Sequence, residues 1–222
     1  VISTNIDIQA YQPAAMYLNG KYWGIYNIRE KFNKNYIFQH HDVEKIDVLE
    51  QNSKIIYGDD KAYNELLDFI RNKNLNDNKN WEWIEKNVDI NNFIDYYCAQ
   101  IYFANTDWPG NNIKYWKSST GKWRWFLHDT DMGFAFAPMW EHPGGIEHNT
   151  LKFALNDSIS KNHNKPWSTL LFRKFLENDQ FKKDFVKNFY LHLNTIFKTE
   201  RVLVVIDSLA SNIASEMPKH IE

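Results

Sequence analysis

The chain has 222 residues, of which 43% are hydrophobic, so it is long enough to form one sizeable domain with its own core. Its 26 Lys and Arg against 28 Asp and Glu exclude the net positive charge with which proteins attract nucleic acid or anionic membranes. No apolar stretch approaches the about 20 residues that a membrane-spanning helix needs, so we expect no membrane insertion. Partners must therefore be recognised at a local site.

The single cysteine, Cys98, cannot form a disulfide within the chain, and no Cys and His spacing typical of a zinc site is present. The first residue is Val1, and no signal peptide or lipidation motif follows it. We therefore expect a fragment of a longer chain whose targeting segment is missing.

The first predicted element is a β-hairpin over residues 14–31 that turns at Asn19-Gly20. This pair is the strongest short hairpin signal, because both positions of a type I′ turn need positive φ. Alternation along the second strand places Arg29 and Lys31 on the same face. A short helix at 33–40 and an apolar patch at 46–49 follow, so we expect a small β-rich lobe over residues 1–58.

Helical patterns dominate from residue 59 onwards. Asp59 or Asp60 is expected to cap a helix, residues 72–80 read as a solvated loop, and residues 81–87 form a short helix. Asp89 is expected to cap a buried helix that includes Cys98. The sequence predicts a further hairpin, with strands at 113–117 and 122–128, and then helices at about 166–177, 180–197 and 201–217, the last capped by Thr199.

These patterns predict an α+β fold, in which a small sheet precedes a helical lobe. We expect the helical lobe to span residues 59–222 and to carry an inserted hairpin at 105–133, within a single domain over 1–222. The cleft between the lobes is the expected site.

Acidic and amide side chains gather at both ends of this second hairpin. Asp107, Asn111 and Asn112 precede its first strand, and Asp129 and Asp131 follow its second. Because hairpin strands are antiparallel, its entry and exit lie side by side, and these groups should converge. Neighbouring carboxylates share a proton or hold a divalent cation, and oxygen ligands favour Mg²⁺, Mn²⁺ or Ca²⁺. Each residue alone is also typical of a turn.

The spacing matches a known catalytic pattern. Asp107 and Asn112 fit the protein-kinase loop D-x-x-x-x-N, in which the Asp accepts the proton of the substrate hydroxyl and the Asn binds Mg²⁺. In that pattern a hairpin then leads to D-x-G, whose Asp holds metal. Here the hairpin leads to Asp131-Met132-Gly133, so both motifs stand at opposite ends of one predicted hairpin.

The chain resembles the CotH-like (spore coat protein H) atypical protein kinases in stretches that span most of it from about residue 14. These are residues 18–26 (LNGKYWGIY) with 29–31 (REK), 105–116 (NTDWPGNNIKYW), 122–125 (KWRW), 129–134 (DTDMGF) and 217–221 (MPKHI). The resemblance implies a two-lobed kinase-like fold that uses ATP and Mg²⁺ or Mn²⁺ to phosphorylate hydroxyls of a protein substrate. It also implies a secreted or cell-surface location, as for spore coat proteins.

Carried over by position, Asp107 looks like the catalytic base and Asn112 like a metal ligand. For the second metal ligand the motif letters favour Asp131, whereas the distance from the strand end favours Asp129, and both are retained.

The phosphate-binding groups are less defined. The two-residue turn Asn19-Gly20 leaves no glycine-rich loop to cover the phosphates, and no V-A-I-K lysine is evident. Arg29 or Lys31 can serve as the phosphate cation, with Glu30 holding one of them or a metal. Lys114, two residues beyond the catalytic-loop asparagine, is a further candidate.

Two other functions fit the same residues. A pseudokinase that binds nucleotide weakly can act as a secreted or surface adhesion module through Trp108, Trp116 and Trp140. A metal-dependent glycosyltransferase can use residues 129–131 as a D-x-D site. The latter normally needs an alternating β/α half, which the helix-rich C-terminal part argues against.

Overall fold

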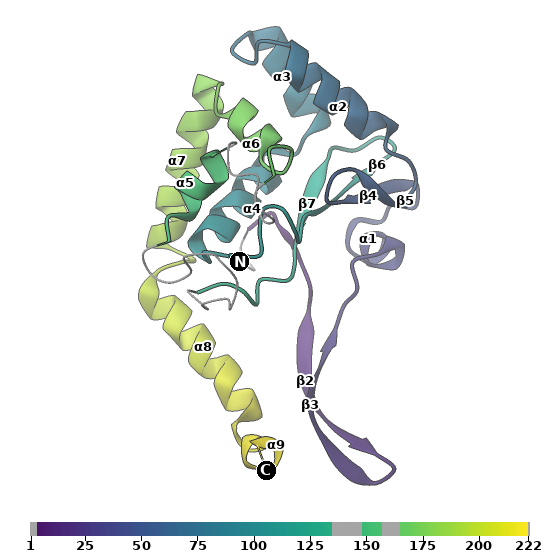
Figure 1. The fold of residues 1–222 in the computed structure, drawn as a ribbon, viewed down its shortest axis with the longest axis vertical. Coiled ribbons are helices and arrows are strands. Elements are labelled where there is room, and N and C mark those ends of the chain that lie inside the picture. The colour runs from purple at the N-terminus through teal and green to yellow at the C-terminus, as the bar shows by residue number, and fades with distance from the viewer. Residues whose placement is uncertain (1–3, 135–147, 157–164, 222) are drawn as a thin grey trace.

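The computed structural model describes residues 4–134, 148–156 and 165–221 and has a mixed α+β architecture (Figure 1). A five-stranded sheet lies against a helical body on one side, and a separate two-stranded ribbon extends away from both. The predicted fold class, small sheet first and helical part second, is confirmed.

The main sheet joins strands from distant parts of the chain. In spatial order its strands are β1 (Asp7–Ile8), β7 (Arg124–Leu127), β6 (Lys114–Ser118), β4 (Ile46–Glu50) and β5 (Lys54–Tyr57). β1 runs parallel to β7, and the other neighbours are antiparallel. The predicted hairpin 105–133 therefore extends the same sheet that holds β4 and β5. This sheet contains strands from both sides of residue 58, where the lobe boundary was predicted. The lobe boundary itself stays a prediction.

Alternation along the strands builds a core on each face of this sheet. Tyr115 and Trp125 point into the large core of the helical body, whereas their neighbours Trp116 and Phe126 point into a smaller core. The smaller core is closed by α1 (Lys34–His41), the short helix predicted at 33–40, whose N-cap is Asn33. Because both faces are covered, the rings of the tryptophan-rich hairpin are buried.

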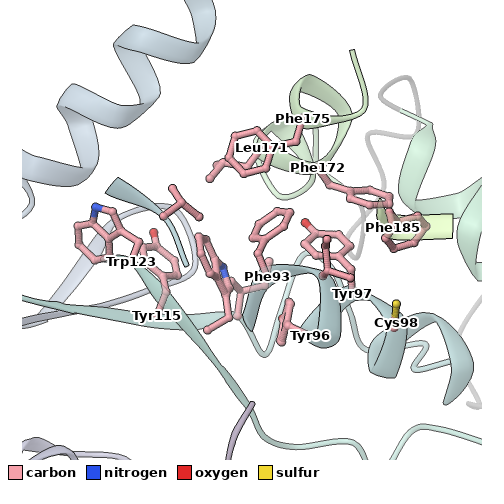
Figure 2. Close-up of a cluster of buried hydrophobic side chains, with 14 of the residues drawn as sticks. Phe93, Tyr96, Tyr97, Cys98, Tyr115, Trp123, Leu171, Phe172, Phe175 and Phe185 are labelled. Atoms are coloured by element: carbon pink, nitrogen blue, oxygen red, sulfur yellow. The ribbon is translucent and has the colours of Figure 1, made fainter. Parts of the chain in front are cut away.

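The helical body is centred on α4 (Ile90–Tyr102), whose residues 92–101 are all buried. Asp89 caps this helix through the backbone N–H of Asn92, as predicted. Figure 2 shows Phe93 and Tyr97 of α4 pointing toward Phe172 across the core. The surrounding helices are α2 (Lys61–Asn72), α3 (Asn78–Asn87), α5 (Thr150–Leu155), α6 (Leu170–Phe175) and α7 (Asp179–Asn194).

The prediction of a solvated loop over residues 72–80 is wrong in its centre. Leu75 is fully buried, and Asp77 caps α3 through the N–H groups of Lys79 and Asn80. The Asn178 side chain donates to the Leu75 carbonyl at 2.7 Å, which fixes this connection on the helical body. One leucine among polar residues gave no periodic signal, so the sequence pattern missed the anchor.

The C-terminal helices differ in detail from the prediction. Only 170–175 of the expected helix at 166–177 is α-helical, and Lys198, not Thr199, is the N-cap of α8 (Thr199–Ala214). A short α9 (Met217–Ile221) follows, and α5, β1 and β5 were also not predicted. Across the described ranges, no helix is long and apolar enough to cross a membrane.

The ribbon confirms the first predicted hairpin. It consists of β2 (Tyr11–Leu18) and β3 (Lys21–Arg29), and Asn19 and Gly20 have φ of 50° and 77°. α9 packs on the ribbon, where Nδ1 of His220 accepts a hydrogen bond of 3.1 Å from the Ile25 N–H. Gly24, at φ 125°, leaves room for this ring, since a Cβ there would lie 3.0 Å from Nδ1. The last helix of the chain thus rests on the ribbon formed near its beginning (Figure 1).

A buried carboxylate ties β1 to the rest of the sheet. Asp7 contacts His41 Nε2 at 2.7 Å, and it accepts hydrogen bonds from Trp116 Nε1 at 2.9 Å and Arg124 Nε at 3.2 Å. Burial by itself raises the pKa of Asp7, but the His41 hydrogen bond, the Arg124 charge and the Trp116 hydrogen bond outweigh it and hold the pKa below 3.8. The ionised carboxylate therefore stabilises the fold.

We expect Asp7→Asn to lower the free energy of unfolding by about 2–3 kcal/mol at pH 7, because Arg124 and His41 lose a buried anionic partner. A carboxyl whose pKa is lower in the folded state contributes stability above its unfolded pKa and loses it as the pH falls through the folded value. The deficit should therefore shrink below about pH 4. Urea unfolding across this range measures it, with the exposed Asp68→Asn as a control that changes stability by less than about 0.5 kcal/mol.

Candidate active site

The loop after α4 carries the predicted D-x-x-x-x-N residues and brings them into direct contact. Asp107 Oδ1 accepts a hydrogen bond from Asn111 Nδ2 at 2.8 Å, and its Oδ2 accepts one from Asn112 Nδ2 at 2.9 Å. Asn112 has φ 54°, a left-handed conformation that Asn tolerates better than most residues. Two amides thus fix the orientation of a half-buried carboxylate.

The loop is anchored from below by Trp108. This side chain is fully buried, and its Nε1 donates to the Tyr96 hydroxyl at 2.9 Å. Trp116 is buried as well. Partner binding through exposed Trp108 and Trp116 rings, one of the predicted alternatives, is therefore wrong, because both rings serve as core. Trp140 lies outside the described residues.

Two neighbouring side chains connect this loop to the far end of the hairpin. Thr106 donates from its N–H and from its hydroxyl to the Met132 carbonyl, each at 3.1 Å, and the buried Asn105 amide donates to the Asp129 carbonyl at 3.3 Å. Gly133 allows the close approach, because a Cβ there would lie 2.9 Å from the Phe103 carbonyl oxygen. This close contact explains why the third position of the D-x-G motif is a glycine.

The carboxylates at the two hairpin ends interact, as the sequence predicted. Partial burial raises the pKa of Asp129, and the nearby carboxylates of Asp131 and Asp107 raise it further, while the Arg29 guanidinium lowers it. Asp129 has φ 53°, so its backbone is in the left-handed conformation and does not continue the extended strand β7. The net effect is a concentration of negative charge that one arginine compensates only in part.

These oxygen ligands fit a hard divalent cation. Within the described ranges, no three Asp, Glu, His or Cys side chains already stand close enough to hold an ion by themselves. Mg²⁺ does not need such a cage, since it is usually bound by one or two carboxylates together with waters and substrate phosphates. The neighbouring carboxylates of Asp129 and Asp131 fit this pattern. The Asn112 side chain contacts Asp107, so its role as a metal ligand stays a prediction.

Of the predicted phosphate-binding residues on the ribbon, one reaches the acidic cluster. Arg29 ends β3 and acts electrostatically on Asp129. Glu30 is engaged elsewhere, because its carboxylate binds His40 Nε2 at 2.8 Å and the Ala10 N–H at 2.8 Å, and these partners lower its pKa. Lys31 follows β3 and is exposed. Glu30 therefore braces the base of the ribbon against α1.

Lys114 lies at the start of β6 in a charged group that sequence reasoning missed. Its Nζ stands 3.8 Å from Glu50 Oε2, and Glu50 also binds Lys54 at 2.7 Å. Burial and the Lys114 charge lower the pKa of the adjacent His128 to about 4, so this ring is neutral at pH 7. Lys114 and Glu50 are paired in register across β4 and β6, and only this long-range pairing reveals them.

The structure thus places a D-x-x-x-x-N loop and a D-x-G turn at opposite ends of one hairpin, and a Lys114–Glu50 pair on the same sheet. The family model described as CotH kinase protein matches residues 2–222, and the chain belongs to this family. Among curated proteins, none matches the sequence.

We expect Asp129→Asn to stabilise the metal-free protein, because a neutral amide avoids the cost of partly burying a carboxylate and removes repulsion from Asp131 and Asp107. After allowance for solvent screening at this exposed residue, the gain should be about 0.5 kcal/mol, which is a rise of about 1–2 °C in Tm for a chain of this length. Thermal unfolding in a chelator measures it. The exposed Asp207→Asn on α8 serves as the control, and an unchanged or lower Tm in Asp129→Asn would contradict the repulsion.

Proposed function

We propose that this protein is a protein kinase that transfers the γ-phosphoryl group of ATP to a hydroxyl of a protein substrate, with Mg²⁺ or Mn²⁺. The observation that carries the proposal is the geometry of Asp107, whose carboxylate is held by the Asn111 and Asn112 amides and whose backbone is linked through Asn105 to Asp129 at the other end of the hairpin. Membership of the CotH kinase family supports a kinase-like activity in general. The substrate, the location outside the cell and the metal are proposals that rest on this resemblance.

Asp107 is the residue that we assign to the substrate hydroxyl. Its carboxylate, fixed by the Asn111 and Asn112 amides, accepts the proton as the hydroxyl oxygen bonds to the γ-phosphorus. The bond from phosphorus to the bridging oxygen breaks at the same centre, and ADP departs. Most of the barrier lowering in such a reaction comes from positioning and charge stabilisation, which a carboxylate held by two amides provides.

The phosphate side is assigned to the residues that surround Asp129. A divalent cation, when bound, would neutralise the phosphate charge, and Asp131, Asp129 and Asn112 would hold it. Arg29 lies on the same side, where it already acts on Asp129. Lys114, oriented by Glu50, is the second cation that we assign to the phosphates, because the neutral His128 beside it adds no competing charge.

The architecture disfavours the glycosyltransferase alternative. The central strands β4, β6 and β7 of the main sheet are antiparallel, so the parallel β/α half that usually binds sugar nucleotides is not formed around residues 129–131. The pseudokinase alternative has one structural argument, the two-residue turn of the ribbon at Asn19-Gly20, which provides no glycine-rich cover for the phosphates. Activity measurements separate it from an active kinase.

We expect Asp107→Ala to reduce the rate of phosphoryl transfer by a factor of about 10²–10⁴. Mn²⁺ and ATP should still raise the Tm of this variant. Asp131→Ala should lose both the transfer and this thermal stabilisation, because it removes a cation ligand. Transfer of labelled γ-phosphate to protein and thermal shift measure the two effects. Asp207→Ala, at an exposed position on α8, serves as the control.

Full transfer in both Asp107→Ala and Asp131→Ala would refute the proposed roles. Thermal stabilisation by ATP without any transfer in the wild-type chain would instead identify a nucleotide-binding pseudokinase.

We expect Lys114→Met to raise the KM for ATP about tenfold with a smaller change in kcat, because one phosphate contact is lost, worth about 1.4 kcal/mol. Lys117→Met on the same strand is the matched control, since its odd-numbered spacing from Lys114 places it on the opposite face of β6. Steady-state kinetics in ATP measure both variants. Equal effects of the two substitutions would remove Lys114 from the site.

A further inference from the structure

We infer that Asn105 is a positioning residue of the proposed kinase site, because one buried amide holds the backbone of Asp107 and the backbone of Asp129 at the same time. The inference rests on the proposed function. It assigns a task to a fully buried residue, which acts through the residues that it holds.

The contacts of Asn105 span the gap between the two hairpin ends. Its side chain is fully buried, its Oδ1 accepts a hydrogen bond of 3.2 Å from the Asp107 N–H, and its Nδ2 donates to the Asp129 carbonyl at 3.3 Å. An amide has an acceptor and a donor in one rigid plane. A single planar group therefore links the Asp107 and Asp129 segments, next to the two hydrogen bonds of Thr106 to the Met132 carbonyl.

The orientation of this amide is itself fixed from behind. Asn105 Nδ2 also donates to Gln100 Oε1 at 3.0 Å, and Gln100 Nε2 lies 3.4 Å from the Tyr96 hydroxyl. The same hydroxyl accepts from Trp108 Nε1 at 2.9 Å, so the network returns to the catalytic loop. Because these groups are buried, turning the Asn105 amide would leave several polar atoms unpaired, which is costly away from water.

The backbone of Asp129 makes this support necessary. At φ 53° it occupies the left-handed region, which Asp adopts more readily than most residues but at a cost relative to negative φ. The hydrogen bond from Asn105 to its carbonyl helps to hold this conformation. Without that bond we expect Asp129 to relax to negative φ, which would redirect its carboxylate away from Asp131 and Asp107 and weaken cation binding.

The test compares three variants of the whole chain. Asn105→Ala removes the bridge, and Gln100→Met removes the acceptor that orients it without touching either hairpin end. The matched control is Asn92→Ala. Asn92 is also a fully buried amide, and it ties α4 to β7 through the Trp125 backbone, but it lies at the opposite end of α4 from the site.

Two measurements are made on each variant after circular dichroism confirms that it is folded. Mn²⁺ affinity, with and without ATP, is determined by electron paramagnetic resonance. In metal-free protein, the intraresidue HN–Hα nuclear Overhauser effect of Asp129 reports positive φ. We expect Asn105→Ala to weaken Mn²⁺ binding at least about tenfold and to lose the positive φ, Gln100→Met to weaken binding about threefold, and Asn92→Ala to change it by less than about twofold at a comparable loss in Tm.

Several results would overturn the inference. These are unchanged Mn²⁺ affinity in Asn105→Ala, an equal loss in Asn92→Ala, or retention of positive φ at Asp129 without the bridge. If Asn105→Ala does not fold, Gln100→Met decides. If the wild-type chain binds no Mn²⁺, the proposed function fails, and the positioning of Asp129 is then judged from the Overhauser effect alone.

Discussion

The antiparallel pairing of β6 with β7 is the constraint on which the rest of the structure depends. It places the loop before β6 beside the segment after β7, so that Asp107 and Asp129 interact although more than twenty positions separate them. Pairing alone brings the backbone together only approximately. Asn105 and Thr106 complete the approach with hydrogen bonds to the carbonyls of Asp129 and Met132.

The aromatic composition of the chain serves this arrangement. Tyr115, Trp125 and Phe93 fill one side of the hairpin, while Trp116 and Phe126 fill the other. Large rings in contact on both faces leave the sheet little freedom to bend. A rigid support suits a site whose chemistry depends on position, since misplacement by an ångström is expensive in catalysis.

Local patterns predicted much of the fold. The Asn19-Gly20 turn, the Asp89 cap and the alternation around Trp116 and Trp125 each carry their information within a few residues, and the structure has the corresponding elements. The sequence did not reveal that β4 pairs with β6, because nothing in either strand identifies its partner. The buried position of Leu75 was missed for a related reason. Its hydrogen-bond partner Asn178, the N-cap of α7, lies about a hundred residues away in the sequence.

The candidate site was predictable to the same extent. The approach of the segment before β6 to the segment after β7 follows from hairpin geometry, and Asn105 and Thr106 form hydrogen bonds across it. The Lys114–Glu50 pair depends on long-range strand pairing, and the engagement of Glu30 with His40 depends on where α1 packs. Neither leaves a trace in local sequence. Asn105 stood within the recognised motif, but its role is visible only in contacts to both ends of the hairpin.

The hydrogen bond between His220 and Ile25 has a structural consequence. Arg29 terminates the same strand that carries Ile25, and its guanidinium lowers the pKa of Asp129. The strand that presents this charge to the acidic cluster is therefore also the strand on which the final helix of the polypeptide rests.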